Sequence, residues 1–360
     1  MTETKRKRIL SGVQPSGKLH LGNYFGAIKQ HIALQEEGEC FYFIADYHAQ
    51  TTLGEAVRLE LEATRDGKRK PRSGAQILQE NVRDVALDYL ALGLDPKKAT
   101  FYRQSDVPEV TELTWILSTV TGMGLLERAH SYKDKVAQGI AASVGLFTYP
   151  ILMAADILIV RSNVVPVGQD QVQHLEMTRD MAGYFNSTFG EVFPLPAERL
   201  DVAAKVSGTD GKKMSKSYGN TIDIFAEGKA LQSSVMSIVT DSTPLEEPKN
   251  PNTCNVFALY KLFATAEEQA SLAKLYENPT QDAVSRKGRA FGYGDAKKLL
   301  LAKIDVFFEQ ARAKRKELDA NPDAVEAVLR TGAAKARAEA RQTMALVRHA
   351  VGMAPAPVVD

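Results

Sequence analysis

The chain has little cysteine and no long apolar run. Its 360 residues include two cysteines, Cys40 and Cys254, which is too few for a disulfide framework or an iron–sulfur site. The most apolar stretch, residues 150–160, is too short to cross a membrane and contains Asp156. The basic start is not followed by the apolar core of a signal peptide, because polar residues and proline interrupt it. These absences predict a protein of the reducing cytoplasm without a membrane segment.

An excess of charge of one sign is also absent. Lysine and arginine total 45 against 44 acidic residues, giving a net charge of +1. This balance argues against a general nucleic-acid binder, so any RNA contact must use local basic patches. Candidate patches lie at residues 5–8, 68–72 and 311–341, where solvated surface is the alternative interpretation. The length predicts about two domains.

The first informative segment is His20-Leu21-Gly22-Asn23. An expected strand at residues 7–10 leads through a glycine-rich turn, residues 11–17, into a helix from about Leu21. Backbone N–H groups and the positive end of a helix favour binding of an anion at such a turn. Glycine at 22 or 26, which lacks a Cβ, allows a base or a phosphate to approach the backbone closely. Residues 12–18 also fit the spacing of a P-loop, but Leu19 has no hydroxyl for magnesium and Pro15 lacks an N–H donor.

The second informative segment is Lys213-Met214-Ser215-Lys216-Ser217, which follows a run of turn-forming residues, 208–211. Lysines on a loop that moves can meet the charge that develops on a triphosphate during displacement at the α-phosphorus. A solvated basic loop is the alternative, but the pairing with the upstream segment favours an ATP-using adenylation site.

Together these segments resemble the two signatures of class I aminoacyl-tRNA synthetases, and further motifs resemble the bacterial-type tryptophanyl-tRNA synthetases. The resemblance covers nearly the whole chain. Its landmarks are residues 11–17, 20–27, 46–49, 132–135, 149–156, 165–171 with His174 and Glu176, and 213–217.

The resemblance implies a tryptophan pocket in which Asp156 accepts the indole N–H. Indole offers a donor and no acceptor, so a buried carboxylate suits it. An N-cap or a buried ion pair is the structural alternative for Asp156, although an apolar run surrounds it. The implied tryptophan-binding residues are Gln14, His48, Tyr149, Met153, Asp156, Val167 and Gln171. No role is assigned to His31, His130 or His349, and His174 is expected to be structural.

For ATP, the resemblance implies residues whose donors and acceptors suit ribose and phosphates. They are Gln14, His20, Gly22, Asn23, Lys135, Gly168, Asp170, Lys213, Met214, Ser215 and Lys216. Of these, Lys213, Ser215, Lys216, His20 and Asn23 are the implied catalytic residues. No carboxylate cage for a metal is visible in the sequence, so Mg²⁺ is expected to be held mainly by the ATP phosphates and water.

The implied activity is tryptophan–tRNA ligation: formation of tryptophanyl-adenylate, then acyl transfer to tRNA(Trp). Positioning and charge stabilisation suffice, so no general base is assigned. The rival interpretations are a tyrosyl-tRNA synthetase and a paralogue that binds tryptophan or its adenylate as a regulatory partner. The family also implies a homodimer formed through residues 107–123.

Strand-like runs at 7–10, 40–45, 99–102 and 164–167 alternate with helical patterns and predict an α/β fold with a Rossmann-like parallel sheet. The expected organisation is a catalytic domain at 1–221 with a helical insertion at about 104–145. It is followed by an all-helical anticodon-binding domain at 222–322. The final helix, 323–352, is expected to pack back on the catalytic domain, and residues 353–360 form a tail.

Two features depart from the family pattern. Residues 53–74 form an extra segment whose basic middle, 66–74, is expected to be a flexible loop, either a tolerated insertion or a contact to the tRNA acceptor arm. Leu10 stands where an aromatic side chain often lines the pocket.

Overall fold

A computed structural model describes residues 7–129, 143–200, 206–281 and 288–354, without the Asp170 side chain. The chain forms two compact units. Unit 1 comprises residues 1–17, 31–202 and 318–360, and unit 2 comprises residues 18–30 and 203–317. The first signature segment thus falls in unit 2 with the lysine loop, whereas the sequence placed both in the first domain. The domain limits of the sequence analysis stay predictions.

Five parallel strands form the sheet of unit 1, in the order β3-β2-β1-β4-β5. They are β1 Arg8–Val13, β2 Glu39–Ile44, β3 Ala99–Arg103, β4 Val164–Val167 and β5 Ala197–Leu200. This confirms the predicted α/β fold class with a Rossmann-like sheet. The strand order reverses between β1 and β4, and parallel sheets bind ligands beyond the carboxyl ends of the strands at such a point.

Strand β5 is the one strand of this sheet that the sequence analysis did not anticipate. Its four residues, Ala-Glu-Arg-Leu, include no β-branched or aromatic side chain, and most of them are exposed. Strand propensity therefore gives no signal there. Pairing with β4, from Val164 opposite Ala197 to Val167 opposite Leu200, holds the segment extended.

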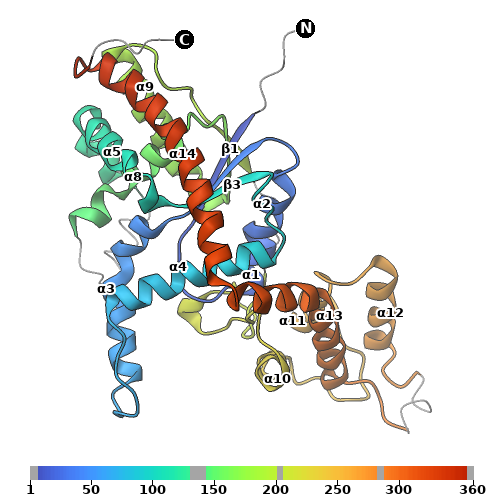
Figure 1. The fold of residues 1–360 in the computed structure, drawn as a ribbon. Helices are drawn as coiled ribbons and strands as arrows, with labels where there is room; N and C mark the ends of the chain where they lie inside the picture. Colours follow the sequence, from blue (N-terminus) through green and yellow to red (C-terminus); the bar gives the residue numbers. More distant parts are fainter. Residues whose placement is uncertain (1–6, 130–142, 201–205, 282–287, 355–360) are drawn as a thin grey trace. The chain divides into compact units, whose positions relative to one another are not determined.

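Helices surround this sheet (Figure 1). Unit 1 contains α3 Asp46–Ala63, α4 Gly74–Ala91, α5 Glu109–Val120, α6 Met123–Glu127, α8 Val144–Ile159, α9 Val172–Phe189 and α14 Pro322–Ala350, with short helices η2 Gln104–Asp106 and η3 Gln169–Gln171. Helix α8 is mostly apolar and packs against α5 and α9, which places Asp156 inside the core. Within the described ranges, every helix falls short of the length and apolar character that a membrane crossing requires.

Helix α14 covers the edge strand β3 and also contacts α5 (Figure 1). Its buried face carries small side chains such as Ala333, Ala336 and Ala340. At Gly332 the helix comes so close that an added Cβ would lie 1.9 Å from the carbonyl oxygen of Phe101. Where α14 contacts α5, Arg337 of α14 donates a 2.8 Å hydrogen bond to Glu109 of α5. The helix therefore shields a sheet edge that would otherwise be open to pairing.

Unit 2 is helical apart from isolated bridges, within the residues described. Its elements are α1 Leu21–Asn23, the π-helical turn η1 Tyr24–Ile28, η4 Lys216–Tyr218, α10 Gly228–Met236, α11 Asn255–Tyr260 and α12 Ala266–Glu277. Helices α2 Lys29–Leu34 and α13 Tyr293–Asp319 run through the unit boundaries. Aromatic rings of Tyr24, Phe25, Phe263, Phe307 and Phe308 lie edge to face or tilted at 4.8–6.1 Å. This cluster anchors the helix start that carries the first signature to the helices of unit 2.

Candidate active site

The first signature segment is held rigidly at the start of α1. Leu21 N–H donates to the carbonyl of Ile222 at 3.0 Å, and Ile224 N–H donates to the carbonyl of Leu19 at 3.2 Å. His20 caps the helix in an extended conformation, and its own N–H donates to Asn23 Oδ1 at 3.1 Å. The side chain of Asn23 is therefore engaged in the capping box. Residues 19–24 and 222–224 form one local framework within unit 2.

His20 is a buried, neutral histidine. Burial and, to a smaller extent, the nearby charge of Lys216 lower its pKa to about 4, against the opposing effect of Asp223. Its Nδ1 has no hydrogen-bond partner among the described residues. An orphaned polar atom in a buried ring is unusual in a folded protein. The ring is thus suited to meet a polar ligand group at the helix start, where anions are favoured.

Asn220 organises the lysine loop, a role that the sequence analysis missed. Its side chain is buried, donates to Asp210 Oδ1 at 2.7 Å and to the carbonyl of Lys213 at 3.1 Å, and accepts from Ser215 N–H at 2.8 Å. The hydrogen bond from Asn220 is the main reason that the pKa of the Asp210 carboxyl is lowered. An added Cβ at Gly208 would lie 2.2 Å from Asn220 Nδ2. The side-chain amide of Asn220, which lies just after residues 213–217, therefore holds the lysine loop in place.

Met214 joins the two signature segments. Its side chain is buried, and its sulfur accepts from Gly22 N–H at 3.4 Å. Lys213 and Lys216 are exposed beside it, and Ser215 Oγ lies 2.8 Å from Ser217 Oγ. The structure thus brings His20, Gly22 and Asn23 together with the lysine loop inside unit 2.

In unit 1, Asp156 lies at the centre of a buried hydrogen-bond network. Gln104 Nε2 donates to both carboxylate oxygens, at 2.8 and 2.9 Å, and His48 Nε2 lies 2.9 Å from Oδ2. Burial raises the pKa of Asp156, and the hydrogen bond from His48 opposes that rise. The Asp156 carboxylate is therefore hydrogen-bonded within the protein, and its role as acceptor of the indole N–H stays a prediction.

Gln104 was not among the predicted site residues. It is 1% exposed, follows β3 directly, and its Oε1 accepts from Tyr47 N–H at 3.0 Å. The same amide thus fixes the start of α3, which carries His48, and orients the carboxylate of α8. A polar residue at the carboxyl end of a predicted strand was the signal that could have found it.

The other predicted tryptophan residues occupy unit 1 as well. Tyr149 Oη lies 2.5 Å from His174 Nε2, so the buried His174 positions a predicted substrate-binding side chain. Gln14 Nε2 donates to Thr52 Oγ1 at 3.2 Å. Met153 lies half-buried in α8, Val167 ends β4, and Gln171 ends η3. Leu10, in place of an aromatic residue, is fully buried in the sheet.

The predicted ATP residues are divided between the units. Gly168 and Asp170 follow β4 in unit 1, as does Gln14 after β1, whereas the two signature segments belong to unit 2. Lys135 lies outside the described residues. In the described part of the chain, no group of three or more histidine, cysteine or acidic residues could hold a metal ion.

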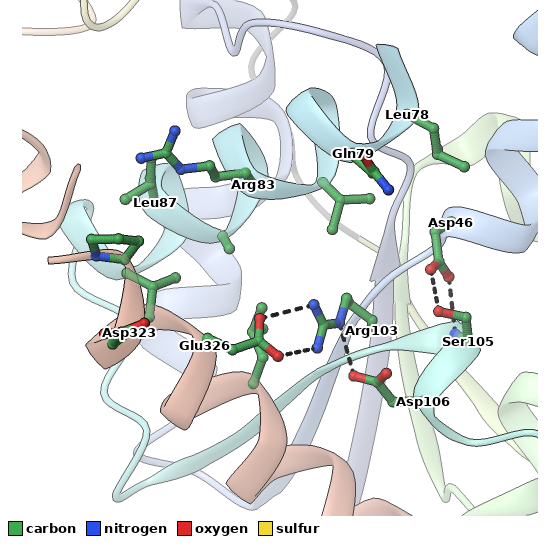
Figure 2. A pocket seen from close by; sticks show the side chains of 15 residues that line it. Asp46, Leu78, Gln79, Arg83, Leu87, Arg103, Ser105, Asp106, Asp323 and Glu326 are labelled. Atoms are coloured by element: carbon green, nitrogen blue, oxygen red, sulfur yellow. Dashed lines mark hydrogen bonds and ion pairs between the residues drawn. The ribbon is translucent and has the colours of Figure 1, made fainter. Parts of the chain in front are cut away.

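Of the cavities that open on unit 1, two include residues of the predicted motifs. One, of about 380 Å³, is lined by α3, α5 and α8 and includes Tyr149 and Tyr47. The other, of about 700 Å³, lies among α4, η2 and α14 and includes Asp46, from the 46–49 motif. Figure 2 shows the hydrogen bonds and ion pairs that already join several of its side chains. Arg103 donates to Glu326 and to Asp106, and Asp46 accepts from Ser105. The Arg103–Glu326 pair beside this second cavity connects β3 to α14. We assign no ligand to the cavity.

A parallel sheet of this order, with the two signature segments in contact, defines a class I aminoacyl-tRNA synthetase. The family model described as tRNA synthetases class I (W and Y) matches residues 2–309, and the chain belongs to that family.

Within the family the chain belongs with the bacterial tryptophanyl enzymes. It is 51% identical to the tryptophan–tRNA ligase of Rhodopirellula baltica, over 96% of this chain and 99% of that protein. It is 52% identical to the tryptophan–tRNA ligase of Fusobacterium nucleatum, over 96% and 98%. A solved structure of tryptophanyl-tRNA synthetase from Campylobacter jejuni, complexed with ADP and tryptophan, is 47% identical and superposes with a TM-score of 0.84 over 96% of this chain and 99% of that one.

Proposed function

We propose that the chain is a tryptophan–tRNA ligase, which activates L-tryptophan with ATP and transfers the tryptophanyl group to tRNA(Trp). The observation that carries this proposal is the contact of Gly22 with Met214, because it joins the two segments of an adenylation site. The tryptophan–tRNA ligases named above and the ADP and tryptophan in the Campylobacter jejuni structure support it.

In the first step, a carboxylate oxygen of tryptophan attacks the α-phosphorus of ATP, and the bond from that phosphorus to the bridging oxygen of pyrophosphate breaks. Lys213 and Lys216 stabilise the charge that develops on the departing pyrophosphate. His20, neutral because of its lowered pKa, donates one ring N–H to a phosphate oxygen. Asn23 and Ser215 contribute further donors. The remaining proposed ATP contacts are Gln14, Gly22, Lys135, Gly168, Asp170 and Met214.

Tryptophan selection is assigned to the Asp156 network. The indole N–H takes the place of one of the two side chains that donate to Asp156, and His48, the more exposed of the two, is the one displaced. Phenylalanine cannot replace that donor, and a site built around a required hydrogen bond rejects such an analogue by about 10⁴ to 10⁵. Gln14, Tyr149 and Gln171 hold the ammonium and carboxylate groups, and Met153 and Val167 contact the ring.

Magnesium would enter this site bound to ATP rather than to protein ligands. Since the described residues include no cluster of metal ligands, the triphosphate and water would hold the ion. When bound, Mg²⁺ neutralises part of the triphosphate charge. We also propose a cytoplasmic homodimer formed through α5, where Trp115 is 70% exposed. A large exposed apolar residue of this kind marks interaction surfaces.

Amino-acid-dependent exchange of pyrophosphate into ATP tests the proposal. Tryptophan alone should support exchange, whereas tyrosine and phenylalanine should not. Exchange with tyrosine would instead favour the tyrosyl enzyme. No exchange with any of the three would overturn the adenylation proposal and favour a partner protein that binds tryptophan.

A further inference from the structure

The extra segment of the chain forms a projecting arm, which we define as residues 55–73. Helix α3 begins beside the tryptophan site at Asp46 and ends at Ala63, and the following residues return along its last turns (Figure 1). At the base, the α-carbon of Gly74 lies against Leu53 and Val57, since a Cβ there would sit 3.4 Å from each. From His48 to Ala63 the helix spans about 22 Å at 1.5 Å per residue. The arm therefore links the amino-acid site to a tip far from it.

The returning segment of the arm, which the sequence analysis expects to be a flexible loop, makes hydrogen bonds to α3 and α4. Glu60 is 5% exposed and accepts from the guanidinium groups of Arg69 and Arg72 and from the backbone N–H of Arg72, the last at 3.0 Å. Arg72 also donates to Glu80 of α4 at 2.5 Å. These hydrogen bonds, first from Arg69 and then from Arg72, hold the pKa of Glu60 well below its usual range. This clasp fixes the path of the chain between α3 and α4.

The clasp leaves other cations free at the tip. Between residues 64 and 73 there are five basic side chains and a single carboxylate, Asp66, in a protein whose total charge is near neutral. Lys68 lies 3.0 Å from Asp66. Arg65 and Lys70 are exposed, and among the described residues no carboxylate pairs with either. Gly67 adopts a φ of +72° at the turn, which presents these side chains on a short, fixed loop.

We propose that this arm binds the phosphate backbone of the acceptor arm of tRNA, through Arg65, Lys68 and Lys70. The inference rests on the proposed function, which requires the 3′ end of tRNA to reach the amino-acid site next to the first turn of α3. An RNA duplex that delivers its end there passes within reach of a basic tip about 22 Å away along the same helix. Because the hydrogen bonds to Glu60 hold the backbone of the loop, its cations bind phosphates with little further loss of backbone entropy. Such contacts position the RNA without reading its sequence.

The test compares two double variants. Arg65→Gln with Lys70→Gln removes the two unpaired cations of the tip and leaves the Glu60 clasp intact. Lys97→Gln with Arg161→Gln removes the same charge from exposed positions elsewhere in unit 1. Each variant and the wild type are assayed for tryptophan-dependent pyrophosphate exchange and for aminoacylation of tRNA(Trp) transcript at several salt concentrations.

The tip variant should raise the KM for tRNA about tenfold, or about 1.4 kcal/mol. It should also reduce the slope of log KM against log salt by about 2, one for each lost phosphate contact. Pyrophosphate exchange should equal that of the wild type in both variants. Equal tRNA KM and salt slope in the tip and control variants would overturn the inference. Absence of exchange in the wild type would instead overturn the proposed function, and with it the inference that the arm binds tRNA for this reaction.

Discussion

The sulfur of Met214 accepts a hydrogen bond at 3.4 Å from the backbone N–H of Gly22, across 192 residues of sequence. Sulfur is a weak acceptor, so the energy of the bond is small. Its importance is geometric, because it fixes the lysine loop against the helix start where a phosphate would bind. A Cβ at Gly22 would lie 3.0 Å from the ring of His20 and 3.3 Å from Met214 Cβ.

Gly22→Ala should therefore separate the two signature segments and impair activation of tryptophan. Misplacement of this kind by about 1 Å can lower the rate about 10²-fold. The measurement is pyrophosphate exchange with ATP varied at saturating tryptophan. Gly294→Ala in α13 is the matched control, since a Cβ there meets nothing within 4 Å and should leave exchange near the wild-type rate. Equal activity of the two variants would show that close approach at Gly22 is not required.

Gln104→Leu tests whether orientation of Asp156 controls tryptophan use. The substitution removes the amide that donates to both oxygens of a buried carboxylate, and a hydrogen bond to a charged group contributes about 1.5–3 kcal/mol. We expect kcat/KM for tryptophan to fall about 10- to 100-fold, with the KM for ATP unchanged. Gln79→Leu, at an exposed position on α4, is the control. A parallel rise in the KM for ATP would point to general loss of structure rather than to positioning of Asp156.

The sequence predicted the sheet and the signature segments because both depend on local patterns. Apolar runs predicted β1 to β4, and glycine turns with lysines predicted the two halves of the adenylation site. The partners of those residues were not predictable in the same way. Gln104 is 52 residues from Asp156, and nothing local marks the pair. His174 matched the family pattern, but its hydrogen bond to Tyr149 exists only after α8 and α9 pack together.

Charge patterns were the least informative part of the sequence. The basic residues near 68–72 look like a solvated loop, yet two of them clasp the buried Glu60. Arginines in the 311–341 range look like a candidate RNA surface, yet Arg337 and Arg341 pair with Glu109 of α5. Whether a cation faces solvent or a carboxylate depends on packing between distant elements, which sequence spacing does not encode.

The burial of His31 predicts that the stability of the fold depends on pH. It is buried between Ser11 and Tyr89, at 3.0 and 3.1 Å, and burial lowers its pKa to about 4. Between pH 6.5 and 4 the unfolded chain binds the proton and the folded chain does not. The free energy of unfolding should therefore fall as the pH falls through that window, by up to about 3 kcal/mol. Urea denaturation at pH 7, 5.5 and 4.5 should show a smaller decline for His31→Gln than for the wild type, and parallel curves would contradict this.

Gly332→Ala should destabilise the contact between α14 and β3. The new methyl would lie 1.9 Å from the carbonyl oxygen of Phe101, which is backbone and cannot move aside as a flexible side chain could. Such overpacking costs about 3 kcal/mol or more. Gly183→Ala in α9 is the control, because a Cβ there meets nothing within 4 Å and helix propensity favours alanine by about 1 kcal/mol. Thermal unfolding should thus shift downward for the first variant and slightly upward for the second.

Trp115, the only tryptophan of the chain, gives a direct test of the homodimer. It projects from α5 with 70% of its surface exposed. Met123 of α6, which contacts α8, is 62% exposed, and Val144 at the start of α8 is 80% exposed. Burial of this side chain against a second copy should move its fluorescence emission to shorter wavelength, and dilution should reverse the shift. Trp115→Ala should weaken the dimer about 30-fold or more in sedimentation, as loss of a buried aromatic anchor costs at least about 2 kcal/mol. Leu195→Ala, at another exposed apolar position, should not change the association. A dimer unaffected by Trp115→Ala would place the interface on another face of the protein.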